Sequence, residues 1–243
     1  MEITSRDNLT FKNLLKLTKK KYRDKLGLCI IEGEKFVTER VGLARSVFVR
    51  KSHSSRYSFT NTCVLNDNLF DEVGTLEATQ GVMAIVSVPR PQALTFPFLV
   101  LDNIQDPGNM GTLLRTAAAF GFKTVFCITC VDVWSQKVIR AGVGSQFSLN
   151  IVDINVENFK SFILNEMKGA ELLIADKGSD EFNFANCMGR FGLVLGNEGR
   201  GISPALKLLP HKVITISMNS CVESLNVAIA GAILMYEAYK VLT

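Results

Sequence analysis

Histidine is scarce in this chain, which contains only His53 and His211. His53 falls in a polar segment, and His211 follows Pro210 just before an expected strand. Histidine is the side chain whose charge changes most readily near neutral pH, and it serves most often as a general acid or base. The scarcity of histidine therefore disfavours a histidine-based reaction.

The residue pattern also predicts neither a secretory signal nor a membrane span. The N-terminus carries acidic residues and has no apolar segment of the kind found in a signal peptide. The most apolar helix that the pattern predicts runs from Leu225 only to Tyr236, whereas a span needs about 20 residues. We therefore expect a cytoplasmic protein that does not insert into a membrane.

The six cysteines do not have the pattern of a disulfide framework or a metal site. Most lie in apolar runs, as reduced core residues of an intracellular protein do. Cys127 and Cys130 form a Cys-x-x-Cys pair on an expected strand, whereas a redox pair would open a helix and zinc would need further ligands. We expect neither a disulfide framework nor a bound metal.

Positive charge is concentrated near the N-terminus. Residues 1–95 contain 15 Lys and Arg against 10 Asp and Glu, while residues 96–243 contain 12 against 13. Apolar residues at helical spacing predict one amphipathic helix over residues 9–26 with a basic outer face. Such a basic face could bind the phosphate backbone of RNA. The alternative is that it is only a solvent-exposed helix face with no binding role. The candidate RNA-binding residues are Lys12, Lys16, Lys19, Lys20, Lys21 and Arg23.

Short apolar runs alternate with helical patterns on both sides of a proline-rich segment around Pro91. Closely spaced prolines favour an extended connection, so we place a domain boundary there. The pattern predicts a small α/β domain over residues 1–91 and a mostly parallel sheet, covered on both faces, over residues 96–243. The expected strands are 29–31, 47–49, 63–65, 82–88, 98–101, 124–128, 147–152, 172–175, 192–195 and 213–216, with helices at 35–41 and 69–76 among others.

The first polar cluster follows the strand at 98–101 and contains Asn103, Asp106, Asn109 and Arg115. Ligands of open α/β sheets bind at the carboxyl ends of the strands, which favours a site here. Residues Asp106 to Asn109 also have the composition of a turn, and we expect Asn109 to be the helix N-cap. Taken alone, these four residues favour a turn and cap over a ligand site. Arg115 shares its helix face with apolar residues, so we expect it beside the core.

The second and third clusters also follow expected strands. Residues 196–201 are glycine-rich and let a ligand approach the backbone, but they lack the endings of a P-loop and the spacing of a dinucleotide fingerprint. A nucleotide-binding regulator is therefore disfavoured. In the third cluster we expect Ser224 to cap the last helix, while Asn226 is a poor helix former that could orient a ligand.

The three clusters, in this order, resemble the motifs of the SpoU (TrmH-type) RNA ribose 2′-O-methyltransferases of the SPOUT superfamily. Two N-terminal segments are similar to the substrate-binding domain of that family, which has a ribosomal-protein-like α/β fold. The resemblance covers nearly the whole chain. It rests on Asn103, Asp106–Asn109, Gly111 and Arg115–Ala117, on Leu195–Gly201, on Glu223–Val227, and on Ile31–Glu34 and Gln80–Ala84.

The resemblance implies an S-adenosyl-L-methionine-dependent RNA 2′-O-ribose methyltransferase with a C-terminal trefoil knot and a homodimeric assembly. The separate N-terminal domain favours large-subunit ribosomal RNA as the substrate, with transfer RNA as the alternative. The implied cofactor-binding residues are Leu195, Gly196, Asn197, Gly199, Ile216, Met218 and Leu225. The implied catalytic residues are Asn109, Arg115, Glu198, Ser224 and Asn226, of which Glu198 and Asn226 order the loops.

One departure bears on activity. The family commonly has Ile-Pro-Met followed by glycine, where this chain has Ile216-Ser217-Met218-Asn219-Ser220. The change favours, as an alternative, an inactive RNA-binding paralogue. Ser224 and Asn226 are retained, so we expect an active enzyme.

Overall fold

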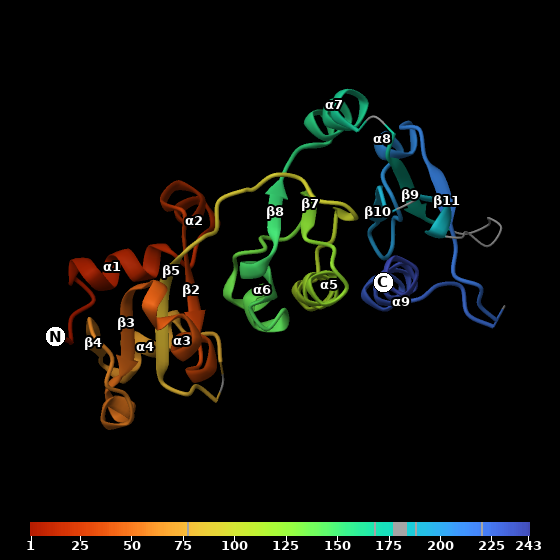
Figure 1. The fold of residues 1–243 in the computed structure, drawn as a ribbon. Coiled ribbons are helices and arrows are strands. Elements are labelled where there is room, and N and C mark those ends of the chain that lie inside the picture. The colour runs from red at the N-terminus through yellow and green to blue at the C-terminus, as the bar shows by residue number, and fades with distance from the viewer. Residues whose placement is uncertain (77, 168, 177–183, 188, 220) are drawn as a thin grey trace. The chain divides into compact units, whose positions relative to one another are not determined.

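The computed structural model describes residues 1–76, 78–167, 169–176, 184–187, 189–219 and 221–243. The chain forms two compact units, which are considered separately below (Figure 1). The N-terminal unit comprises Met1–Pro89 with Trp134–Arg140, and the C-terminal unit comprises Arg90–Val133 with Ala141–Thr243. The chain therefore passes from one unit to the other in the proline-rich segment, but nothing in the sequence indicated that 134–140 groups with the N-terminal unit.

The N-terminal unit is built on a five-stranded sheet with the order β1-β4-β3-β5-β2. Strand β5 runs antiparallel to β2 and β3, and the other pairs are parallel. All four strands predicted in this region are present, and most residues of β2 and β5 are buried, whereas Leu65 is the buried residue of β4. The elements are β1 (Glu2–Ile3), α1 (Leu9–Lys16), α2 (Lys20–Leu26), β2 (Leu28–Glu32), α3 (Glu34–Arg40), β3 (Ala44–Arg50), β4 (Thr62–Leu65), α4 (Asp67–Val73) and β5 (Val82–Ser87).

The prediction of one continuous helix over 9–26 is wrong, because the chain breaks between α1 and α2. Thr18 Oγ1 donates to the Leu15 carbonyl at 2.8 Å, and Arg23 donates to the Leu17 carbonyl at 2.6 Å. Side chains thus satisfy carbonyls that a continuing helix would have used. The break turns Leu17 into the core, where it is 2% exposed.

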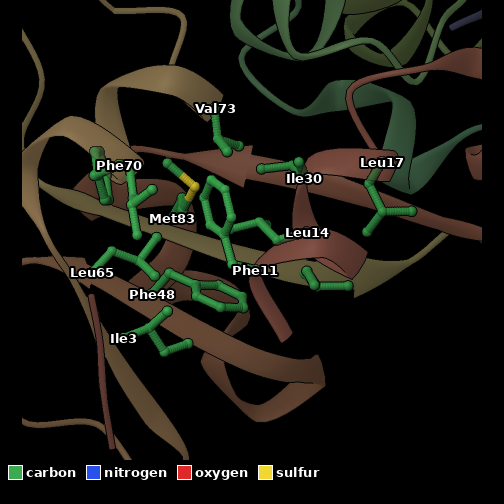
Figure 2. Packing of buried hydrophobic residues seen from close by; sticks show 12 residues of the cluster. Ile3, Phe11, Leu14, Leu17, Ile30, Phe48, Leu65, Phe70, Val73 and Met83 are labelled. Atoms are coloured by element: carbon green, nitrogen blue, oxygen red, sulfur yellow. The ribbon is translucent and has the colours of Figure 1, made fainter. Parts of the chain in front are cut away.

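The core of the N-terminal unit lies between its sheet and helices α1 and α4. Phe11 and Leu14 of α1 and Phe70 of α4 are fully buried with Phe48 and Met83 of the sheet. Figure 2 shows these side chains pointing toward one another. The apolar spacing of α1 therefore serves packing on the sheet and leaves its lysines outside.

The C-terminal unit contains a six-stranded sheet with the order β11-β9-β10-β6-β7-β8, and every pair is parallel. This confirms the predicted parallel sheet. The strand expected at 147–152 begins only at Asn150, because residues 145–148 form a 3-10 turn. Helix α6 (Gln136–Ala141) falls, except for its last residue, in the segment that groups with the N-terminal unit. The elements of the C-terminal unit are β6 (Phe98–Asp102), α5 (Pro107–Ala119), β7 (Thr124–Ile128), β8 (Asn150–Asp153), α7 (Val156–Glu166), β9 (Glu171–Ala175), β10 (Phe191–Leu195), α8 (Pro204–Lys207), β11 (Lys212–Ile214) and α9 (Val227–Leu242).

Helices cover both faces of this sheet. Phe159 of α7 and Leu206 of α8 pack with Val100 and other residues on one face. Successive residues of a strand point to opposite faces of the sheet. Leu195 of β10 points to the other face, where helices α5 and α9 lie side by side (Figure 1). A Cβ on Gly231 of α9 would lie 2.6 Å from Leu195 Cδ1, so this glycine permits the close packing.

Helix α9 continues to Leu242, beyond the expected end at Tyr236. In the described parts of the chain, no helix combines the length and apolar character needed to cross a bilayer.

Candidate functional site

The site forms at the carboxyl ends of β6 and β10, which are neighbours in the sheet. The first polar cluster follows β6 and the second follows β10, so parallel pairing places them together. Asn197 Nδ2 donates to the Asn103 carbonyl at 2.9 Å and ties the two clusters together. Asn103 has a φ of 58°, and its Oδ1 accepts from Gln105 Nε2 at 2.7 Å. Asparagine tolerates this left-handed conformation better than most residues, which suits it to the turn.

Asp106, and not Asn109 as predicted, caps helix α5. Its Oδ1 accepts from the Asn109 backbone N–H at 2.8 Å, and Pro107 occupies the first helical turn. Asp and Pro are favoured at these positions of a helix start. The carboxylate accepts a hydrogen bond from a backbone N–H that has no partner within the helix, and proline has no backbone N–H to satisfy. The Asn109 side chain is therefore available for other contacts.

The Asn109 amide joins all three motifs. Its Nδ2 donates to Glu198 Oε1 at 2.5 Å, and its Oδ1 accepts from Asn226 Nδ2 at 3.0 Å. Asn226 in turn caps α9, since its Oδ1 accepts from the backbone N–H groups of Ala228 at 2.9 Å and Ile229 at 3.3 Å. The prediction that Ser224 caps this helix is therefore wrong. One side chain thus connects segments 89 and 117 residues further along the chain.

The glycine-rich loop after β10 closes on itself. The backbones of Asn197 and Gly201 exchange hydrogen bonds of 2.9 and 3.0 Å, and Asn197 Oδ1 accepts from the N–H groups of Gly199 and Arg200. A Cβ on Gly196 would lie 2.5 Å from the Gly201 carbonyl carbon. Only glycine fits at position 196 without moving the backbone of the loop.

A cavity of about 520 Å³ lies between this loop, the segment after β11 and helix α9. All seven predicted cofactor-binding residues line it, with Glu198 and Ser224 of the predicted catalytic set. The sequence analysis did not single out Asp176 and Lys207, which also line the cavity. Asp176 directly follows β9, so a polar residue at the end of an apolar strand was the signal that could have found it.

Arg115 is not beside the core as expected but exposed. It lies on the outer side of α5 and makes no hydrogen bond or ion pair with the described residues. The apolar neighbours Leu114 and Ala117 turn inward because a helix separates adjacent residues by about 100°. Of the predicted catalytic residues, Asn109, Glu198 and Asn226 are joined by hydrogen bonds, whereas Arg115 is not bonded to any of them.

Of the departures from the family motif, the structure describes Ser217, which lies between the cavity-lining residues Ile216 and Met218. Ser217 and Ser224 are exposed, as is Met218 at 39%. Ser220 falls outside the described residues. Ile216 and Met218 still line the cavity despite the missing proline.

The basic residues of the N-terminal unit are only partly available to a partner. Arg23 is 6% exposed and bonded to the Leu17 carbonyl, so the prediction that it contacts RNA is wrong. Lys12 pairs with Asp7 at 2.7 Å, and this contact lowers the pKa of the Asp7 carboxyl. Lys16, Lys19, Lys20 and Lys21 are exposed.

None of the six cysteines, all of which lie in the described part of the chain, forms a disulfide. Burial, with a hydrogen bond to Glu171, raises the pKa of Cys187 to about 12, which makes its thiol unreactive. A hydrogen bond with Cys127 lowers the pKa of Cys130, whose thiol also donates to the Leu101 carbonyl at 3.2 Å. Among the described residues, no group of three or more His, Cys, Asp or Glu is arranged to hold a metal ion.

Comparison with known families decides which reading of the three motifs holds. The chain matches the SpoU rRNA methylase family over residues 97–236 and an MRM3-like substrate binding domain over residues 8–84. The chain belongs to the SpoU rRNA methylase family. The predicted family, the α/β fold with an N-terminal substrate-binding domain, the methyltransferase class and S-adenosyl-L-methionine as cofactor are thereby confirmed.

Full-length relatives support this membership. The 23S rRNA (guanosine(2553)-2′-O)-methyltransferase RlmP of Bacillus subtilis is 30% identical, over 97% of this chain and 98% of its own. A putative RNA methyltransferase of the TrmH family from Porphyromonas gingivalis has a TM-score of 0.77 at 30% identity, covering 94% of this chain and 96% of its own. The AdoMet-bound rRNA methyltransferase from Sinorhizobium meliloti has the same fold, with a TM-score of 0.81 at 24% identity over 100% of this chain and 98% of its own.

Proposed function

We propose that this protein methylates a ribose 2′-hydroxyl of large-subunit ribosomal RNA. The observation that carries the proposal is the Asn109 amide, which joins Glu198 and Asn226 next to the cavity. The relative RlmP, which by its name acts on 23S rRNA, aligns with both units of this chain. That full-length similarity favours ribosomal RNA over transfer RNA.

The cavity fits the cofactor in size and chemistry. Ligand cavities commonly measure roughly 300–1,000 Å³, and this one measures about 520 Å³. Leu195, Ile216, Met218 and Leu225 give it apolar walls suited to a nucleobase, and Gly196 exposes backbone groups to a ligand. When bound, S-adenosyl-L-methionine supplies an electrophilic methyl group on a sulfonium.

Arg115 is the proposed contact for the reacting ribose. A 2′-hydroxyl is a weak nucleophile, so negative charge on its oxygen must be stabilised as the methyl group moves. A guanidinium has a pKa of roughly 13.8, which makes it a poor base but a good partner for a phosphate and an alkoxide. We assign Arg115 that role, with Asn109, Ser224 and Asn226 positioning the ribose and Glu198 holding Asn109 in place.

We also propose that residues 1–91 bind the RNA substrate, that residues 96–243 carry out catalysis, and that the protein is a cytoplasmic homodimer with a C-terminal trefoil knot. Ile229, Ile233 and Tyr236 recur every three to four residues on α9 and are 52%, 37% and 48% exposed. An exposed apolar stripe of this kind supports association with a second copy. Membership of the SpoU family supports the proposed knot.

Mapping ribose methylation across total RNA, with and without the protein, tests the proposed function. We expect a 2′-O-methyl group at one site of large-subunit ribosomal RNA only when the protein is present. Methylation confined to transfer RNA would contradict the substrate. Absence of both methylation and calorimetric binding of S-adenosyl-L-methionine would contradict the enzyme and favour the inactive paralogue.

Reversing three charges tests the basic surface. The triple change Lys19→Glu, Lys20→Glu and Lys21→Glu should weaken RNA binding and reduce the slope of log affinity against log salt by about 2 to 3, since each phosphate contact contributes about 0.9. The same reversal at Lys123, Lys160 and Lys240 in the C-terminal unit is the control. Equal losses in both variants would mean that only net charge matters.

A further inference from the structure

A charged pair at the cavity has no role in the function described so far. Asp176 is the first residue after β9, and its backbone N–H donates to the Ile214 carbonyl at 3.1 Å. Its Oδ2 accepts from Lys207 Nζ of α8 at 2.6 Å. The two side chains are 38% and 45% exposed, and both line the cavity. Lys207 therefore fixes the direction of the carboxylate, which is partly exposed at the cavity.

We propose that the Asp176 carboxylate accepts hydrogen bonds from the ribose hydroxyls of S-adenosyl-L-methionine, and that Lys207 holds the carboxylate in position. The inference rests on the proposed function, because it assumes that this cavity holds the cofactor. An ionised carboxylate only accepts hydrogen bonds, and the vicinal 2′- and 3′-hydroxyls present two donors side by side. In dinucleotide-binding folds, an acidic residue likewise accepts a hydrogen bond from a ribose hydroxyl.

Charge distinguishes the ribose from the other polar parts of the cofactor. The sulfonium and the α-ammonium are cations, and an unpaired carboxylate would attract either. Lys207 lies 2.6 Å from Asp176 and compensates its charge, which weakens the attraction of the carboxylate for a cation but leaves it a hydrogen-bond acceptor. Such an acceptor suits a neutral diol better than a cation.

Calorimetric binding of two ligands to the full chain tests the proposal. The ligands are S-adenosylhomocysteine, which lacks the reactive methyl group, and its 2′-deoxyribose counterpart. Hydrogen bonds to charged groups correspond to roughly 10- to 100-fold in affinity, so the unmodified protein should bind the deoxy ligand more weakly by about that factor. Asp176→Asn should weaken binding of S-adenosylhomocysteine similarly and should largely remove the preference between the two ligands.

The matched control is Glu171→Gln, at the opposite end of β9. Glu171 pairs with Lys212 and does not line the cavity, so this change removes the same charge from the same strand. It should leave both affinities unchanged. Thermal unfolding of each variant shows whether it is folded. The comparison of the two ligands on the unmodified protein does not depend on the folding of any variant.

Two results would overturn the inference while leaving the proposed function intact. One is equal affinity of the unmodified protein for the two ligands. The other is an Asp176→Asn variant that loses affinity for both ligands by the same factor or for neither. If the unmodified protein binds neither ligand, the proposed function itself fails.

Discussion

Replacing Arg115 by alanine should reduce methyl transfer by roughly 10²- to 10³-fold or more, the range seen when a group that stabilises a developing oxyanion is removed. Cofactor affinity and the free energy of unfolding should barely change, because Arg115 is exposed and unpaired within the described chain. Single-turnover methylation with saturating cofactor measures the first effect. Calorimetry and chemical denaturation measure the other two.

Two further variants separate charge from geometry. Arg115→Lys keeps the positive charge but loses the planar fork that binds a phosphate through two hydrogen bonds, so it should recover only part of the rate. Lys123→Ala removes another exposed cation from the same unit and should leave the rate unchanged. Loss of folding or of cofactor binding in Arg115→Ala would instead make Arg115 a structural residue.

Adding one methyl group at Gly196 should have the largest effect on cofactor binding. The alanine Cβ would lie 2.5 and 2.6 Å from the Gly201 carbonyl carbon and oxygen, and backbone atoms cannot rotate away as a side chain can. Overpacking of this kind costs about 1–3 kcal/mol, and here the loop that lines the cavity must take up the movement. We expect S-adenosylhomocysteine affinity to fall by roughly 10- to 100-fold or more in calorimetry, with a lower melting temperature.

Gly42→Ala is the control for that change. A Cβ at Gly42 meets no atom within 4 Å, so the same substitution there should alter neither binding nor melting temperature. Wild-type affinity in Gly196→Ala would mean that the loop rearranges freely and that its observed shape does not matter for the ligand.

Strands were predicted well because each depends on a short apolar run. The run Thr124–Ile128 is an observed strand with the same bounds, and Phe98–Asp102 differs from its prediction by one residue. All residues of both strands are buried, as expected for mainly apolar segments of a parallel sheet that is covered on both faces. Helix ends were predicted less well, since a cap depends on which side chain reaches the free N–H groups.

The predictions that failed depended on side-chain contacts and helix faces that the residue pattern does not fix. The periodicity of residues 9–26 continues through Leu17, but the buried bond from Arg23 to the Leu17 carbonyl interrupts the helix. Ser224 and Asn226 are both acceptable caps, and the contact of Asn226 with Asn109 accompanies the choice of Asn226. Arg115 was placed by its neighbours in sequence, although its own helix face turns outward.

By itself, the sequence determined the family, the parallel α/β class and nine of the residues that line the cavity, because motif residues and apolar runs are local properties of the chain. Only the tertiary structure decided that Asn109 holds Glu198 and Asn226 together, and that Asp176 and Lys207 line the same cavity as Glu198. These contacts join residues 31 to 117 positions apart. They depend on β10 pairing with both β6 and β9, and the order of strands in a sheet is set by packing of the whole unit rather than by any local pattern.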